Sequence, residues 1–317
     1  MRVARFAFLF LLFLGNAVAQ PFPSKQLRLI TPFPPGGSAD VIARITGQAL
    51  GEALGQAVLV ENRAGAGGMV GSDHAAKQPP DGHTLLLITG AYPVSAAIMK
   101  QMPFDPLKDI AMVSVLTSYP FVVSVAANSP LKSFPDLVAH ARANPGKLNY
   151  ASAGIGSVHH LSGELFNALA GTDITHVPFR GGNAPLTETL AGRADVLFEA
   201  MTLSIGQIQA GKLRPLAVTS RERWKALPEV PTAQETLPGF EVISFIGLGV
   251  TGGTPAPIVD QLNRAVRKAL DQPEVHKRFV ELGGAPRATS PEEMRSFIAG
   301  EIEKWRKVIA VRKIEKQ

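Results

Sequence analysis

Short apolar runs alternate with helical patterns in the first third of the chain. The runs LRLIT, VLVEN, TLLLIT and IAMVSVL have the length and composition of buried strands, whereas residues 39–54 follow a helical period. The apolar positions of that period are Val41, Ile42, Ile45, Ala49, Leu50, Ala53 and Leu54. Repeated strand and helix units of this size predict a parallel sheet covered by helices on both faces.

A second series of strands and helices begins at FVVSVAA. It continues through LNYAS, ITHVPF, ADVLFEA and LRPLAVTS, with a helix start at Ser133, another near Ser157 and a third near Pro185. A proline-rich stretch follows, and ISFIGLGV then predicts one more strand that returns the chain to the first unit. The chain ends in helices, the last of which opens with the capping box that begins at Ser290. Two α/β units joined by two crossing segments leave a cleft that hinge bending can close on a ligand.

The first nineteen residues have the pattern of a cleaved secretory signal. Arg2 and Arg5 form a basic start, residues 6–14 are apolar but too few to span a bilayer, and Ala17-Val18-Ala19 supplies a small-residue cleavage site. The chain has no cysteine, which excludes a lipoprotein signal and a fold that depends on disulfides. We therefore expect a periplasmic protein of about 300 residues, a length that favours two domains.

The net charge does not indicate a nucleic-acid partner. The formal charge is +6, and removal of Arg2 and Arg5 leaves +4 for the mature chain. Most of the excess lies near the C-terminus at helical spacing among glutamates, which is typical of a solvated helix face. Basic clusters with interleaved aromatic residues, which nucleic-acid binding requires, are absent from the sequence.

Three loops share one design, in which a strand is followed by a glycine-rich turn and a helix start. They are PFPPGGSAD at 32–40, NRAGAGGMVG at 62–71 and SAGIGSVHH at 152–160. Ligands of open parallel sheets bind at the carboxyl ends of the strands, where helix N-termini offer free N–H groups and a partial positive charge. The loops thus predict a carboxylate site, with the alternative that each glycine only shapes a turn.

Other kinds of site fail on spacing. The glycine turns lack the full dinucleotide pattern, no phosphate-binding Gly-x-x-x-x-Gly-Lys-Ser/Thr motif exists, and Tyr150 stands where a nucleophile elbow requires glycine. His159 and His160 are adjacent and would point to different faces of a helix, so we expect no metal site and no cofactor. Asp40, Asp195 and Glu199 are candidate acids or bases, although acidic residues near helix starts are more often dipole partners.

The order of motifs resembles one family. PFPPGGSAD, ENRAGAGGMVG, GKLNYASAGIGSVHHL, VPFRGG, AGRADVLFEA and AGKLRPLAVTSRERW are similar to segments of the periplasmic solute-binding proteins of tripartite tricarboxylate transporters, also called Bug proteins. The resemblance implies an α/β, two-lobed "Venus flytrap" of type II-like fold with two crossing hinge strands. It also implies a protein that binds small carboxylated solutes and delivers them to the permease subunits of a tripartite tricarboxylate-type transporter.

On this basis the chain is expected to divide into a signal peptide at 1–19, domain I at 20–118 and 247–317, and domain II at 119–246. Family members hold a carboxylate through backbone N–H groups, hydroxyls and waters from loops between the lobes. Carried onto this chain, the resemblance implies these ligand-binding residues: Phe33, Gly36, Gly37, Ser38, Gly65, Ala66, Gly67, Gly68, Ser152, Gly154, Gly156, Ser157 and His160.

Three positions depart from the family pattern and concern the distal part of the ligand. Phe179 replaces a usual tyrosine, Glu199 a common aspartate and Phe245 a frequent tryptophan. These changes favour a less polar pocket and an aromatic or bulky monoacid. Arg180, which could pair with a second carboxylate, favours a diacid instead, so the sequence leaves the ligand open.

The function expected from the sequence is that of a monomeric binding protein that closes on its solute without covalent chemistry. One alternative is a periplasmic enzyme that acts on an organic acid, which would need a nucleophile and a base within reach of each other. The other is a sensory module that passes the signal to a membrane kinase.

Overall fold

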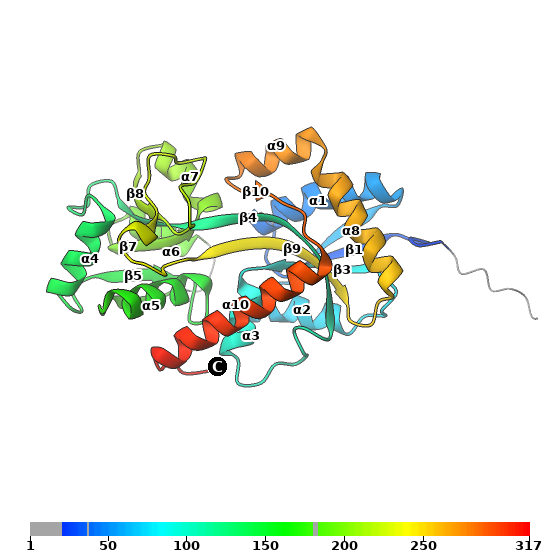
Figure 1. Ribbon diagram of the computed structural model, residues 1–317, viewed down its shortest axis with the longest axis horizontal. Helices are drawn as coiled ribbons and strands as arrows, with labels where there is room; N and C mark the ends of the chain where they lie inside the picture. Colours follow the sequence, from blue (N-terminus) through cyan, green and yellow to red (C-terminus); the bar gives the residue numbers. More distant parts are fainter. Residues whose placement is uncertain (1–20, 37, 180–182) are drawn as a thin grey trace, which may run out of the picture.

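The computed structural model describes residues 21–36, 38–179 and 183–317 of the chain. Two α/β lobes lie side by side along the longest axis of the molecule, and two long strands run between them (Figure 1). The predicted signal peptide, together with Gly37 and Arg180 of the predicted site, falls outside the described residues.

The sheet of the first lobe has the strand order β2-β1-β3-β9-β4. Its strands are β1 (Leu27–Thr31), β2 (Val58–Asn62), β3 (Thr84–Thr89), β9 (Ile243–Thr251) and the first part of β4 (Ile110–Ala126). The first three are parallel, as the sequence predicted, whereas β9 runs antiparallel to both β3 and β4. Every residue of β3 is buried, which explains why its sequence is a continuous apolar run rather than an alternating one.

The second lobe is built on the other end of β4. Its further strands are β5 (Asn149–Ser152), β6 (Thr175–Pro178), β7 (Val196–Ala200) and β8 (Leu213–Val218). Strand β4 pairs with β7 and β8, and β7, β5 and β6 follow in parallel. A two-residue strand, β10 (Ala285–Pro286), pairs with the middle of β4.

Strand β4 is one continuous strand where the sequence suggested two. The two apolar runs are joined through Pro120, which is the last residue paired with β9, while Phe121 is the first paired with β7. Proline has no N–H to donate to a neighbouring strand, and Pro120 lies at the point where pairing with β9 ends and pairing with β7 begins. The chain thereby crosses between the lobes on β4 and returns on β9.

Helices cover both sheets, and the serine caps predicted from the sequence are present. Ser133 Oγ accepts a hydrogen bond from the Asp136 N–H at 3.2 Å, and Ser290 forms a complete capping box with Glu293. Helices α7 and α9 and strand β10 were not predicted. The helices are α1 (Ser38–Leu54), α2 (Met69–Ala76), α3 (Ala91–Ile98), α4 (Phe134–Ala143), α5 (Val158–Ala170), α6 (Ala184–Leu190), α7 (Met201–Gln209), α8 (Ala256–Leu270), α9 (Pro273–Glu281) and α10 (Pro291–Val311), with 3₁₀ turns η1 (Ala66–Gly68) and η2 (Ala233–Glu235).

Helix α10 packs against both lobes. Met294 and Ile298 lie in a core cluster of the first lobe, whereas Trp305 and Val308 lie in the core of the second, and Figure 1 shows the helix running beneath both. The assignment of all of 247–317 to domain I therefore stays a prediction. The helix is amphipathic, and no helix within the described part of the chain is both long and apolar enough to cross a membrane.

Candidate functional site

The first turn, residues 32–36, is organised by the carboxylate of Asp40. Asp40 is only 4% exposed and accepts hydrogen bonds from the Gly36 N–H (3.0 Å), the Arg44 guanidinium (both 3.1 Å) and the Asn62 amide (2.9 Å). Asn62 also donates to the Phe33 carbonyl at 3.0 Å. Burial by itself would raise the pKa of Asp40, but the hydrogen bonds from Arg44, Gly36 and Asn62 outweigh it and hold this pKa below its usual value. Asp40, a candidate acid in the sequence, is an anchor of the turn.

The second turn, residues 65–68, touches the first. Gly65, Gly67 and Gly68 have φ values of 141°, 64° and 96°, in the region that favours glycine. A Cβ on Gly68 would lie 3.3 Å from Pro32 and 3.6 Å from the Phe33 ring, and one on Gly67 would lie 3.3 Å from Ser95 Oγ of α3. The absence of side chains lets the two turns and α3 meet.

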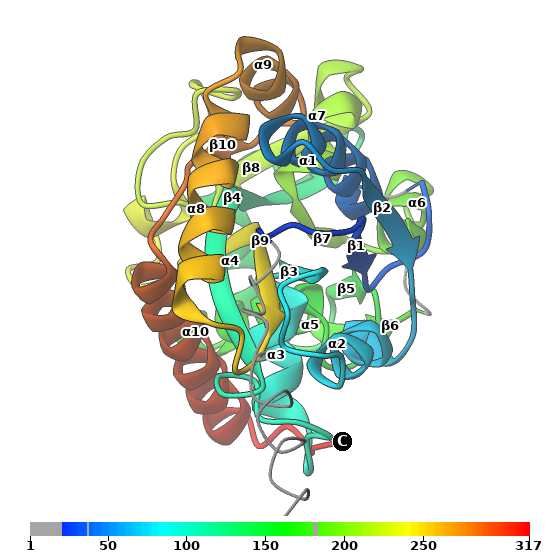
Figure 2. The same cartoon turned by 90° about the vertical axis from the view of Figure 1, so that its right-hand side faces the viewer.

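The third turn, residues 152–157, approaches α3 from the second lobe. Ser152 Oγ accepts from the Gly154 N–H at 3.1 Å, and Ser157 caps α5 by accepting from the His160 N–H at 3.1 Å. A Cβ on Gly156 would lie 3.2 Å from two side-chain carbons of Ile98 at the end of α3. The second and third turns therefore both contact α3, and the first turn packs on the second, so the three glycine-rich turns form one connected group. Figure 2, turned by 90°, shows α3 and α5 together in the lower half of the molecule.

The start of α3 also joins the lobes. A Cβ on Gly90 would lie 2.7 Å from Ser244 Oγ of β9 and 3.6 Å from Val158 at the start of α5. Gly90, Ser244 and Val158 were not among the predicted site residues. Their proximity depends on packing between segments that are distant in the sequence, which leaves no local signal.

The backbone donors of the third turn differ from those predicted. The N–H groups of Gly154 and Gly156 donate within the protein, to Ser152 Oγ and to His160 Nδ1. In the described ranges the N–H groups of Val158 and His159, in the first turn of α5, have no protein acceptor. These two donors lie at the positive end of the α5 dipole and are available to an anion.

Glu199 is paired with His159. In the sequence, His159 was considered only as a metal ligand, and that role was excluded. Oε1 of Glu199 lies 2.9 Å from His159 Nε2 and accepts the Ala200 N–H at 2.8 Å, while the Glu199 side chain is 1% exposed. Oε2 is buried and has no partner in the part of the chain that the structure describes. The carboxylate therefore lies beneath the start of α5, with one acceptor unused.

The other predicted residues are distributed as follows. Ser38 opens α1, and Phe179 fixes the third turn through its N–H, which donates to the Ser152 carbonyl at 2.9 Å. The prediction for Phe245 was wrong, because its side chain is 1% exposed and packs edge-on against Phe297 at 4.9 Å in the core of the first lobe. Neighbouring side chains of a strand point to opposite faces, so Ser244 faces Gly90 and Phe245 faces the core. The imidazole of His160 lies against Gly156 and His176 and not against the unoccupied donors.

Ser152 and His176 form the nucleophile–base contact that the sequence did not reveal, with 2.6 Å between Oγ and Nε2. Ser152 is fully buried, however, and its hydroxyl also contacts the N–H and carbonyl of Gly154. Burial and then the neighbouring His160 lower the pKa of His176 to about 4, which makes it a weak base. Residues 21–36, 38–179 and 183–317 contain no group of three His, Asp or Glu side chains arranged to hold a metal.

Comparison with known proteins gives a consistent result. Residues 42–314 match the family described as "Tripartite tricarboxylate transporter family receptor". The periplasmic binding protein BugD is 28% identical, with a TM-score of 0.82 over 93% of this chain and 100% of that one. A protein of R. palustris solved with adipate is 34% identical (TM-score 0.84; 93% and 99% covered). MatC of Rhodopseudomonas palustris, solved with bound malate, is 33% identical (TM-score 0.81; 91% and 100% covered).

Proposed function

Because the chain belongs to the family of tripartite tricarboxylate transporter receptors, we propose that it captures a small carboxylated solute between its lobes and delivers it to the membrane subunits of such a transporter. Its fold is the two-lobed α/β fold of periplasmic binding proteins. The two lobes are joined by β4 and β9, and hinge closure about these strands is the proposed mechanism of capture.

The observation that carries the proposal is that the three glycine-rich turns converge: the first packs on the second, and the second and third both contact α3. Their backbones approach closely because positive-φ glycines stand where a Cβ would crowd Pro32, Ser95 and Ile98 at 3.2–3.3 Å. The N–H groups of Val158 and His159, which have no acceptor in the described part of the chain, offer an anion charge-assisted hydrogen bonds, each of about 1.5–3 kcal/mol.

We propose a dicarboxylate as the solute class. Two similar proteins hold adipate and malate, both of which carry two carboxylates. The aromatic monoacid suggested by the departures at Phe179, Glu199 and Phe245 loses support, because Phe245 lies in the core and Glu199 is paired with His159.

Binding without chemistry is proposed over the enzyme alternative. The Ser152–His176 contact favours an enzyme, and the burial of Ser152 opposes it. The proposed location is the periplasm, reached through cleavage of the predicted signal peptide, and the proposed working form is a monomer without a cofactor.

Thermal unfolding with a panel of organic acids tests the solute. A dicarboxylate at one hundred times its Kd should stabilise the mature protein by about 2.7 kcal/mol. Absence of stabilisation by every acid would contradict the proposal, and turnover of a bound acid seen by mass spectrometry would revive the enzyme alternative.

Measurements on cells that lack this protein distinguish a function in transport from one in sensing. Loss of uptake of the labelled solute supports the receptor function. Unchanged uptake combined with a lost transcriptional response to the solute would favour the sensory module instead.

A further inference from the structure

Two stacked imidazoles lie behind the third turn. The rings of His160 on α5 and His176 on β6 are 4.1 Å apart, with 22° between their planes. Both are buried or half-buried, and their ring nitrogens contact Gly156 and Ser152 of the third turn. Solute binding as described so far leaves this pair without a role.

His160 holds the turn through a bond that only a neutral ring can make. Its Nδ1 accepts the Gly156 N–H at 3.1 Å, which requires a lone pair on Nδ1 and places the ring proton on Nε2. An imidazolium carries a proton on both nitrogens and cannot accept this bond. Protonation of His160 would therefore release Gly156.

His176 holds the same turn through Ser152. Its Nε2 lies 2.6 Å from Ser152 Oγ, which in turn accepts the Gly154 N–H at 3.1 Å. This contact survives protonation, because Nε2–H can donate to the hydroxyl. The pair thus fixes both glycines of the turn, and His160 is its proton-sensitive member.

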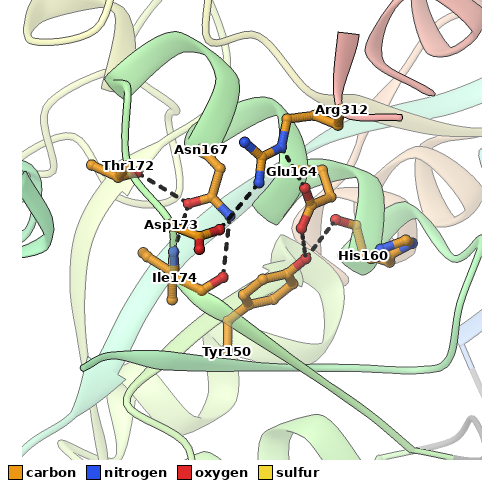
Figure 3. Close-up of polar contacts among 8 residues, drawn as sticks. All are labelled: Tyr150, His160, Glu164, Asn167, Thr172, Asp173, Ile174 and Arg312. Atoms are coloured by element: carbon orange, nitrogen blue, oxygen red, sulfur yellow. Dashed lines mark hydrogen bonds and ion pairs between the residues drawn. The ribbon is translucent and has the colours of Figure 1, made fainter. Parts of the chain in front are cut away.

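The groups around the pair hold α5 in place. The Tyr150 hydroxyl of β5 lies 3.1 Å from the His160 carbonyl and 2.8 Å from Glu164 Oε1, and Arg312, just after α10, bonds to Glu164 at 2.7 Å and Asp173 at 3.3 Å (Figure 3). The Tyr150 ring also stacks on His176 at 5.0 Å.

The charges that face the imidazoles largely cancel. Glu164 favours a protonated His160, but it is neutralised by Arg312. Within the described residues, the cavity of about 570 Å³ that both imidazoles line is also lined by the charged side chains of Lys100, Glu315 and Lys316. Burial outweighs the attraction of Glu164 and lowers the pKa of His160. The ring is consequently neutral, as its bond to Gly156 requires.

We propose that His160 and His176 are positioning residues of the solute site, and that protonation of His160 releases the third turn and weakens solute capture at acidic pH. The inference rests on the proposed function, since it concerns how the first N–H groups of α5 are presented to the solute. In this proposal the two histidines act on the turn and not on the solute itself.

Two substitutions of His160 separate the hydrogen bond from the titration. In His160→Asn the amide oxygen can stand near the position of Nδ1 and accept the Gly156 N–H without titrating, whereas His160→Ala removes the acceptor. Isothermal titration with a dicarboxylate at pH 7.5 should show about tenfold weaker binding for His160→Ala and an affinity within about threefold of wild type for His160→Asn. On lowering the pH to 5, wild type should lose affinity and His160→Asn should lose much less.

His140→Asn, at an exposed position on α4, is the control and should behave as wild type.

Hydrogen exchange of the third turn provides a readout that needs no solute. Corrected for intrinsic rates at pH 7.5, the Gly156 amide should exchange about tenfold faster in His160→Ala than in wild type or His160→Asn. Equal exchange in the three proteins, or an unchanged pH profile of affinity in His160→Asn, would overturn the inference. If wild type binds no acid while exchange changes as expected, the proposed function fails and the positioning of the turn stands.

Discussion

The first and third turns show one backbone design held by two different anchors. Both follow a strand, use positive-φ glycines and lead into a helix. The first is held by the buried carboxylate of Asp40, with Arg44 and Asn62 as partners, and the third by the neutral ring of His160. A carboxylate with a lowered pKa keeps its bonds well into the acid range, whereas an imidazole acceptor is lost near its own pKa. The two lobes therefore contribute halves of the site that respond differently to protons.

The largest effect is expected from removal of the charged anchor. Asp40→Ala leaves Arg44, Asn62 and the Gly36 N–H without their acceptor and should lower the free energy of unfolding by about 3 kcal/mol in urea titrations. Asp73→Ala, which breaks an exposed pair with Lys77 in the same lobe, is the matched control and should cost less than about 1 kcal/mol. Equal losses of unfolding free energy in the two variants would show that Asp40 stabilises the protein no more than an exposed ion pair does.

The next effect compares alanine at one glycine of each turn. Gly36 and Gly156 have φ values of 85° and 76°, so alanine is strained by roughly 1–2 kcal/mol at either position. A Cβ at Gly36 meets nothing within 4 Å, whereas one at Gly156 lies 3.2 Å from Ile98. Gly156→Ala should weaken solute binding by about thirtyfold and Gly36→Ala by about threefold in isothermal titration. A larger loss for Gly36→Ala would show that close approach at α3 is unimportant.

Acid should destabilise the second lobe through its histidines. The pKa of His176 is about 4 in the folded protein and lies below its usual value, so the unfolded chain binds more protons between these two values. Stability from this group is present above pH 6.5 and is lost as the pH falls towards 4, by about 2 kcal/mol after allowance for partial exposure. Urea unfolding at several pH values should show this loss in wild type and a smaller one in His176→Gln. If the free energy of unfolding of wild type increased as the pH fell from 6.5 to 4, a lowered pKa of His176 would be contradicted.

The smallest effect concerns the support behind the third turn, which Arg312 provides by pairing with Glu164. Arg312→Gln leaves Glu164 buried beside Tyr150 without its cation and should lower the free energy of unfolding by about 1 kcal/mol. Asp173→Asn, whose side chain is 76% exposed, should change it by less than about 0.5 kcal/mol. Chemical denaturation measures both free energies of unfolding. Equal changes in the two variants would show that the Arg312–Glu164 pair does not support the third turn.

The elements and the turns could be predicted because their signals are local. The runs LRLIT, VLVEN and TLLLIT became β1, β2 and β3, and Ser133 and Ser290 cap the helices that they were predicted to start. The distal pocket could not be predicted in this way. Phe245 was predicted to line that pocket. Neighbouring side chains of β9 point to opposite faces, however, so the Phe245 ring lies in the core and Ser244 faces Gly90. His159 and Glu199 come together only when α5 packs over β7.

The order of apolar runs, helical periods and glycine-rich turns determined that this chain is a two-lobed α/β protein with N–H donors at its strand ends. Those features depend on backbone geometry and burial, which neighbouring residues specify. The tertiary structure alone decided which donors are free, because Gly154 and Gly156 bond to Ser152 and His160, whereas the N–H groups of Val158 and His159 remain available in the described chain. Whether a donor is free depends on acceptors from strands and helices distant in sequence, and only the packed lobes bring those acceptors within hydrogen-bonding distance.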